Sequence, residues 1–176
     1  PRGKAYRRPK AAPTKAPATE LDDELLSLVS WLIPNEQEAS METHLPLRTD
    51  AEGPLKSDLR NIAAKLWDKG VEHIVITLGG HGAVVVKADG LTYIPCVSMR
   101  HVADPTAAGD SFVGALAVGV TLGLSHAQAL EFAAYTAALT VSRMGAMPSL
   151  PTLEEVLTLM RERGCQAPAR LDVLKA

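Results

Sequence analysis

One stretch in the second half of the chain combines residue types that could move a phosphoryl group. Small residues lead to Gly109 and Asp110, and an apolar segment of helical character follows from Phe112. A turn into a helix leaves the first backbone N–H groups, here those of Ala107, Ala108, Gly109 and Asp110, as donors that attract phosphate. An adjacent carboxylate could take the proton of an alcohol, which suits phosphoryl transfer from a nucleotide to an alcohol. An ordinary helix start with Asp in its first turn explains the stretch equally well.

A second candidate is the glycine-rich segment 78–82, which follows the apolar, β-branched run 73–77. Ligands of open α/β sheets bind at the carboxyl ends of such strands, so the segment is well placed. By itself it is weak evidence, because it has neither the glycine spacing of a dinucleotide fold nor the lysine of a P-loop. His81 is expected to be an exposed loop residue, since no second histidine lies at metal-ligand spacing.

The elements around these segments indicate an α/β fold. Leucines and a valine from Leu21 to Leu32 have helical spacing, a short strand ends near Pro34, and residues 41–56 look irregular. A helix from Ser57 to Gly70 precedes strand 73–77, and strands 83–86 and 91–94 flank an Asp89-Gly90 turn. Further helices are expected over 112–122, from a Ser125–Gln128 capping box to about 143, and from a Thr152–Glu155 capping box to Gly164. The last residues look frayed.

Composition favours one domain with a sizeable core, because 47% of the 176 residues are hydrophobic. The net charge of −2 gives no strong field for nucleic acid, and no apolar run approaches membrane-spanning length. Residues 1–18 are basic and proline-rich, which predicts a linker or mobile loop. Two cysteines, Cys96 and Cys165, make no disulfide framework, so we expect a reducing, cytoplasmic setting. Both cysteines and both tryptophans, Trp31 and Trp67, are expected to be packing residues.

Four segments together resemble the ribokinase-like (PfkB) carbohydrate kinases. Asp104–Leu116 is similar to the second signature of that family, Asn35–Glu38 to its N-x-x-E motif, and Ile76–Ala83 to its nucleotide-side segment. Val141–Pro151 is similar to the corresponding segment of members that phosphorylate ribose. The order and spacing are those of the family, over about Ala16 to Gly164. Because the first half of the family pattern is absent, the chain resembles the C-terminal half.

The resemblance implies a Rossmann-like ribokinase fold of three αβα layers with a mostly parallel sheet, present as its C-terminal part. Residues 19–165 would form the nucleotide-binding part of the kinase, preceded by the linker 1–18 and followed by a C-terminal tail, 166–176.

The resemblance also assigns roles in catalysis and nucleotide binding. Asp110 matches the catalytic base that contacts the substrate hydroxyl, and Ala107, Ala108 and Gly109 complete the anion hole around the transferring phosphoryl group. Asn35 and Glu38 match residues that organise Mg²⁺ and phosphate, largely through water. Without the resemblance, Asn35 would be interpreted as an ordinary helix cap. The matching nucleotide loop consists of Thr77, Leu78, Gly79, Gly80, His81 and Gly82.

A monovalent cation site for K⁺ is implied beside the anion hole. Its ligands would be the Asp104 side chain and oxygens of Thr106, Thr140, Arg143, Gly145 and Ser149. The alternative is that Asp104 only caps a turn and Gly145 only ends a helix. Pro105 departs from the family pattern, which usually has Thr there, and it removes one N–H.

The implied activity is ATP-dependent phosphorylation of a sugar hydroxyl, with D-ribose giving D-ribose 5-phosphate. Its partners would be the sugar and ATP, with no nucleic acid and no membrane, and a homodimer is an option for the full-length protein. Two alternatives stay open. The chain could be a non-catalytic nucleotide-binding fragment, or a kinase of this family acting on another sugar or a nucleoside.

Overall fold

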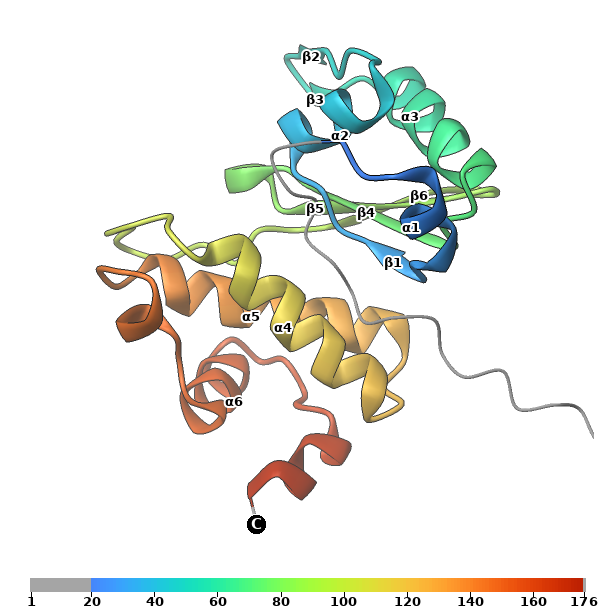
Figure 1. Ribbon diagram of the computed structural model, residues 1–176. Coiled ribbons are helices and arrows are strands. Elements are labelled where there is room, and N and C mark those ends of the chain that lie inside the picture. The colour runs from blue at the N-terminus through green and yellow to red at the C-terminus, as the bar shows by residue number, and fades with distance from the viewer. Residues whose placement is uncertain (1–19, 176) are drawn as a thin grey trace, which may run out of the picture.

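The computed structural model describes residues 20–175, so the predicted linker 1–18 lies outside the described residues. Helices cover both faces of a four-stranded sheet (Figure 1), which confirms the α/β class. The strands are, in spatial order, β1 (Trp31–Leu32), β4 (His73–Thr77), β5 (Ala83–Lys87) and β6 (Gly90–Ile94).

The sheet is mixed, which corrects the expected mostly parallel sheet for the described part of the chain. β1 and β4 are parallel, whereas β4–β5 and β5–β6 are antiparallel. The cause is the length of the connections. Only a few residues join β4 to β5 and β5 to β6, and such short turns can link only antiparallel neighbours. The long crossover that the parallel pair requires is supplied by residues 36–68, which contain α2 (Glu36–Thr43) and α3 (Lys56–Asp68).

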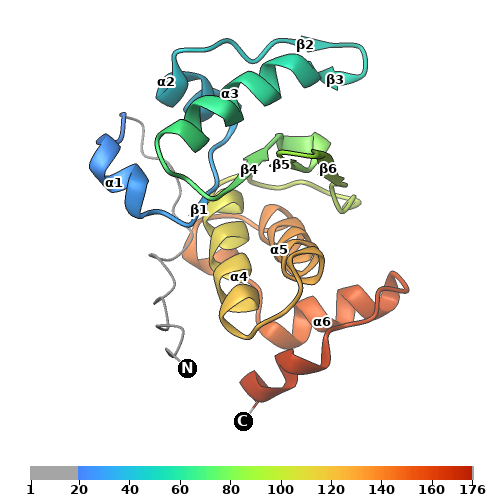
Figure 2. The same cartoon turned by 90° about the vertical axis from the view of Figure 1, so that its right-hand side faces the viewer.

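Three layers follow from the alternation of side chains along the strands. In β4, Ile74 and Ile76 pack with one set of helices, and Val75 packs with the other. Figure 2 shows α2 and α3 on one side of the sheet and α4 and α5 on the other, so the αβα layering is confirmed. The first set of helices is α1 (Asp23–Leu28), α2 (Glu36–Thr43) and α3 (Lys56–Asp68). The second is α4 (Ala108–Thr121), α5 (His126–Val141) and α6 (Leu153–Glu162).

The region expected to be irregular, 41–56, is ordered by polar contacts. It contains the end of α2 and a small antiparallel pair, β2 (Thr49–Asp50) and β3 (Gly53–Pro54). Arg48 binds the buried Asp58 of α3 through its backbone N–H and two guanidinium nitrogens, at 2.7–2.9 Å. These hydrogen bonds hold the pKa of Asp58 at about 2. The prediction that Ser57 caps this helix is wrong, because the N-cap of α3 is Leu55, two residues earlier.

On the second face of the sheet, helices α5 and α6 begin where the sequence predicts. Both predicted capping boxes, Ser125–Gln128 and Thr152–Glu155, are present at the starts of α5 and α6. α4 and α5 approach closely because Gly119 faces Ala129: a Cβ on Gly119 would lie 2.8 Å from the Cβ of Ala129.

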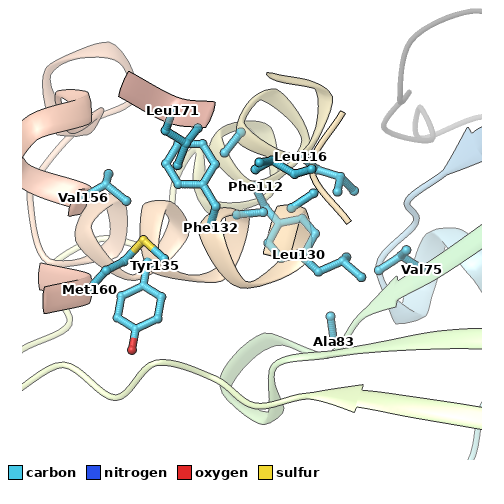
Figure 3. Close-up of a cluster of buried hydrophobic side chains, with 14 of the residues drawn as sticks. Val75, Ala83, Phe112, Leu116, Leu130, Phe132, Tyr135, Val156, Met160 and Leu171 are labelled. Carbon is cyan, nitrogen blue, oxygen red and sulfur yellow. The ribbon is translucent and has the colours of Figure 1, made fainter. Parts of the chain in front are cut away.

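The C-terminal residues are packed, so the expected frayed tail is wrong. They form a 3₁₀ helix, η3 (Ala169–Lys175), and Leu171 is fully buried. Figure 3 shows Leu171 beside Phe132, at the end of the hydrophobic cluster that is farther from the sheet residues Val75 and Ala83. Trp31 is buried and Trp67 packs against the core, as expected, but Cys96 is exposed and is not a packing residue.

Candidate active site

The turn before α4 opens a helix, as the sequence predicts. Ala107 adopts a left-handed conformation, with φ of +62°, and reverses the chain into α4. The Ala108 N–H donates to the Pro105 carbonyl at 3.2 Å, and the Ser111 N–H donates to the Ala107 carbonyl at 2.9 Å. Within the described part of the chain, the Gly109 N–H between them has no acceptor. This donor lies at the positive end of the α4 dipole, where an anion is favoured.

Asp110 lies in the first turn of α4, and its residue surface is exposed. Together with Ala107 it borders a cavity of about 510 Å³ whose walls are mostly apolar, including Val118, Phe132 and Leu150. The carboxylate is therefore next to a helix N-terminus and open to a cavity that a ligand could enter. Both conditions are needed by a group that takes a proton from a bound alcohol.

Asp104 bridges the turn before α4 to the loop after α5. One carboxylate oxygen accepts the Thr106 N–H and the other accepts the Gly145 N–H, each at 2.9 Å. The Ala103 and Asp104 N–H groups also donate to the Val141 carbonyl at the end of α5, at 2.8 and 3.2 Å. Hydrogen bonds from Thr106, followed by that from Gly145, hold the pKa of Asp104 below its usual range.

The other residues predicted for a cation site bond mainly to their neighbours in the chain. The carbonyl of Thr140 accepts the Arg143 N–H at 3.2 Å, one turn from Gly145. Ser149 is fully buried in the 3₁₀ helix η2 (Met147–Ser149), and its hydroxyl donates to the Ala146 carbonyl at 2.6 Å. Asp104, Thr106 and Gly145 are thus in direct contact, whereas Ser149 bonds elsewhere. Among residues 20–175, no cluster of three or more His, Cys, Asp or Glu could hold a metal.

The predicted nucleotide loop is a tight turn at the carboxyl end of β4. It contains the 3₁₀ helix η1 (Gly79–His81), and the Leu78 N–H donates to the Gly82 carbonyl at 2.8 Å. Gly82 has φ of +88° and lies against the backbone that follows β6. Gly79, Gly80 and His81 are exposed, so the turn presents its backbone to solvent.

Asn35 and Glu38 are brought beside this loop by the parallel pairing of β1 and β4. Asn35 forms an isolated bridge with Thr77, whose N–H donates to the Pro34 carbonyl at 2.9 Å. Asn35 and Glu38 also form a capping box at the start of α2, at 2.8 and 2.9 Å. The interpretation of Asn35 as a helix cap is therefore confirmed, while a role toward Mg²⁺ stays a prediction.

Sequence reasoning missed the partner of Arg143. Its guanidinium forms an ion pair with Glu155, at 2.7 Å. The capping box identified Glu155 as a helix-start residue, but a contact across twelve residues and a loop leaves no local signal.

Comparison with known proteins gives one family. The model of the pfkB family carbohydrate kinases matches residues 5–153. A ribokinase of Schizosaccharomyces pombe is 38% identical over 145 residues, which are 80% of this chain and 43% of that protein. A ribokinase of Haemophilus influenzae is 35% identical over 82% of this chain and 45% of its own length. The chain therefore spans less than half the length of these relatives.

A solved structure agrees with the sequence relatives. The structure of Arabidopsis thaliana ribokinase complexed with ribose and ATP superposes with a TM-score of 0.74 at 33% identity. The match covers 81% of this chain and 44% of that one. The fold described above thus resembles that of the corresponding part of this ribokinase.

Proposed function

Since the chain belongs to the pfkB family of carbohydrate kinases, we propose that it handles the nucleotide and the phosphoryl group in an ATP-dependent kinase that converts D-ribose to D-ribose 5-phosphate. Relatives named ribokinase, and a ribokinase solved with ribose and ATP, support this donor and this acceptor. The observation that carries the proposal is the exposed Asp110 carboxylate at the start of α4, beside the Gly109 N–H and at the rim of a cavity.

In the proposed mechanism, Asp110 accepts the proton of the sugar hydroxyl as its oxygen attacks the γ-phosphorus of ATP. The N–H groups at the start of α4, including that of Gly109, hold the negative charge on the transferring group, and the helix dipole adds to their effect. The γ-phosphoryl group passes to the sugar oxygen and ADP leaves. The protein forms no covalent bond with the substrates in this mechanism, so it would accelerate the reaction mainly by positioning them and by stabilising the negative charge.

The nucleotide would lie against the turn 77–82, whose glycines let its backbone approach a ligand. Asn35 and Glu38 flank this turn and offer amide and carboxylate oxygens. Each of these oxygens accepts one hydrogen bond in the capping box and keeps a second lone pair. They could therefore bind the water molecules of a hydrated Mg²⁺ ion. When bound, Mg²⁺ would neutralise charge on the phosphates.

A K⁺ site is proposed around Asp104. Both carboxylate oxygens of Asp104 accept one N–H each, and each keeps lone-pair capacity for a hard cation. Oxygens of Thr106, Thr140, Arg143, Gly145 and Ser149 would complete the site.

The second candidate function is nucleotide binding without turnover. In that case the turn 77–82, where Gly79, Gly80 and His81 are exposed, would hold the nucleotide and no acceptor would be phosphorylated. A kinase of the same family that acts on another sugar or a nucleoside would share the same phosphoryl-transfer residues, so only the acceptor distinguishes it.

The test is an ADP-release assay with ATP, ribose and a panel of other sugars and nucleosides, together with a nucleotide-binding measurement. Asp110→Asn should lower turnover by about 10²–10⁴-fold, the usual contribution of a general base, while nucleotide affinity is kept. Asp68→Asn, an exposed carboxylate at the end of α3, is the matched control and should leave turnover unchanged.

Each outcome selects one function. Undiminished turnover in Asp110→Asn removes Asp110 from its role. Nucleotide binding with no ADP release on any acceptor supports the non-catalytic candidate, and turnover confined to another acceptor rejects ribose.

A further inference from the structure

The loop between α5 and α6 is held by polar contacts more than by apolar packing. Two of its large apolar side chains, Met144 and Met147, are 70% and 82% exposed. Between them, Gly145 has φ of +88° and donates its N–H to Asp104. A loop whose apolar side chains point outward needs other anchors to hold one conformation.

Arg143 supplies such an anchor, because it binds Glu155 through two nitrogens. Its Nη2 lies 2.7 Å from Oε1 of Glu155, and its Nη1 lies 3.3 Å from Oε2. This fork geometry fixes the direction of the guanidinium as well as its distance. The two side chains are 35% and 42% exposed, so the pair is partly shielded from water.

Glu155 is itself immobilised on α6. Its carboxylate accepts the Thr152 N–H at 2.7 Å and the Thr152 hydroxyl at 3.1 Å, in the capping box that starts the helix. The Arg143 guanidinium, followed by the Thr152 N–H, lowers the pKa of Glu155 to about 2. The partner of Arg143 is therefore a charged group with a fixed position.

The contact continues toward the candidate active site through the backbone. Arg143 is two residues before Gly145, whose N–H meets one oxygen of Asp104, and the other oxygen accepts the Thr106 N–H. Thr106 leads directly into the left-handed Ala107 that opens α4. A series of short contacts thus links α6 to the N–H groups beside Asp110.

We propose that Arg143 is a positioning residue. Its ion pair with Glu155 fixes the loop after α5, so that Gly145 and Asp104 hold the backbone N–H groups at the start of α4 in place. The proposal rests on the proposed function, because the position of these N–H groups matters only if they receive the γ-phosphoryl group. The competing explanation is that the pair only strengthens the start of α6.

The experiment compares Arg143→Met and Arg143→Lys with Arg161→Met in the full chain. Arg161 lies on α6, the helix that carries Glu155, and its guanidinium donates to the Leu157 carbonyl and the Thr158 hydroxyl of that helix. Amide hydrogen exchange is followed at Gly145 and Thr106, and affinity is measured for MgADP and for the Mg²⁺ complex of the β,γ-imido analogue of ATP.

In Arg143→Met, exchange at Gly145 and Thr106 should be faster by about tenfold, because the loop opens more readily. The imido analogue, which carries a γ-phosphate, should bind several-fold more weakly, while MgADP affinity is kept. Arg143→Lys should recover part of both effects, since it keeps the charge without the fork. Arg161→Met should change neither.

Unchanged exchange at Gly145, or equal losses of affinity for both nucleotides, would overturn the proposal. Faster exchange confined to α6 would leave only the helix-start explanation. If the unmodified chain binds neither nucleotide, the proposed function fails, and unchanged exchange at Gly145 would reject the loop-fixing role separately.

Discussion

Gly82 is the residue in the candidate nucleotide loop whose lack of a side chain matters most. Its backbone is left-handed, and a Cβ there would overlap the Ile94 carbonyl and lie 2.7 Å from the Cys96 nitrogen. The loop after β4 therefore lies directly on the backbone after β6. Any side chain would push the two segments apart and change the shape of the loop that would meet the nucleotide.

Gly82→Ala should consequently lower the free energy of unfolding by about 1–3 kcal/mol from backbone strain, with the overlap adding to this loss. Urea denaturation measures the change. Gly80→Ala is the control, because a Cβ on Gly80 would meet nothing within 4 Å and its φ is not left-handed. Equal stability of the two variants would contradict the close approach.

At the scale of elements, the start of α5 meets the sheet through three rings. Trp31 of β1 lies 4.4 Å from His73 of β4 and 4.8 Å from His126 of α5, and the two imidazoles are 5.0 Å apart, measured between ring centroids. His126 is the first residue of α5, where the helix dipole disfavours a positive charge. The cluster therefore brings His73 of the sheet into contact with the ring of the first residue of α5.

Burial, followed by the neighbouring His126, lowers the pKa of His73; Lys87 also lowers it, and Glu72 opposes the shift. A histidine whose pKa is lower in the folded than in the unfolded protein binds fewer protons when folded. Its stabilising contribution is complete above the unfolded pKa of about 6.5 and is lost as the pH falls below that value.

We therefore expect the urea concentration at the unfolding midpoint to decrease as the pH is lowered from about 7.5 to about 5.5. In His73→Gln this decrease should be smaller. The exposed His101 gives the control, since His101→Gln should keep the slope of the unmodified chain. If His73→Gln kept the same slope, the ring cluster would not be the source of the acid sensitivity.

Elements with local signals were the ones that the sequence could predict. The capping boxes of α5 and α6 and the turn before α4 each depend on residues three or four apart, and all three are present. Only the start of α2 was indicated, by Asn35 as a helix cap; the length of the helix was not, because its buried positions include Glu42 and Thr43, which show no hydrophobic periodicity. Glu42 is tolerated inside because it accepts the Leu21 N–H and binds Lys69, at 2.8 and 3.1 Å.

For the candidate site, the Ala107–Asp110 turn could be predicted from the residues because it depends on a helix start, whereas Asn35 and Thr77 were assigned to one site by the family resemblance. The contacts of Asp104 with Gly145 and of Arg143 with Glu155 could not, since they join residues 41 and 12 positions apart. Such pairs depend on how whole helices pack, which no single segment encodes.

At the scale of the molecule, the described residues form one three-layer unit that includes the 3₁₀ helix η3 (Ala169–Lys175). No helix among residues 20–175 is long and apolar enough to cross a membrane. Beyond α6 the chain returns to α4: Arg170 donates to the Leu122 and Gly123 carbonyls at the end of that helix, at 3.0 and 2.7 Å. The C-terminal segment thus satisfies carbonyls that α4 leaves without an intrahelical donor.

Leu171 tests whether this segment is part of the core. It is fully buried in the cluster with residues of α4, α5 and α6 (Figure 3), whereas Val173, two residues later, is 63% exposed. Leu171→Ala should lower the free energy of unfolding by about 2–5 kcal/mol, the usual cost of emptying a buried leucine site. Val173→Ala should change it by less than about 0.5 kcal/mol. Both are measured by urea denaturation, and similar values for the two would place the segment outside the cooperative unit.

A large loss of stability in Leu171→Ala alone would mean that the packing of α4 depends on residues 169–175. Asp110 lies at the other end of α4, so its position would depend on the same residues.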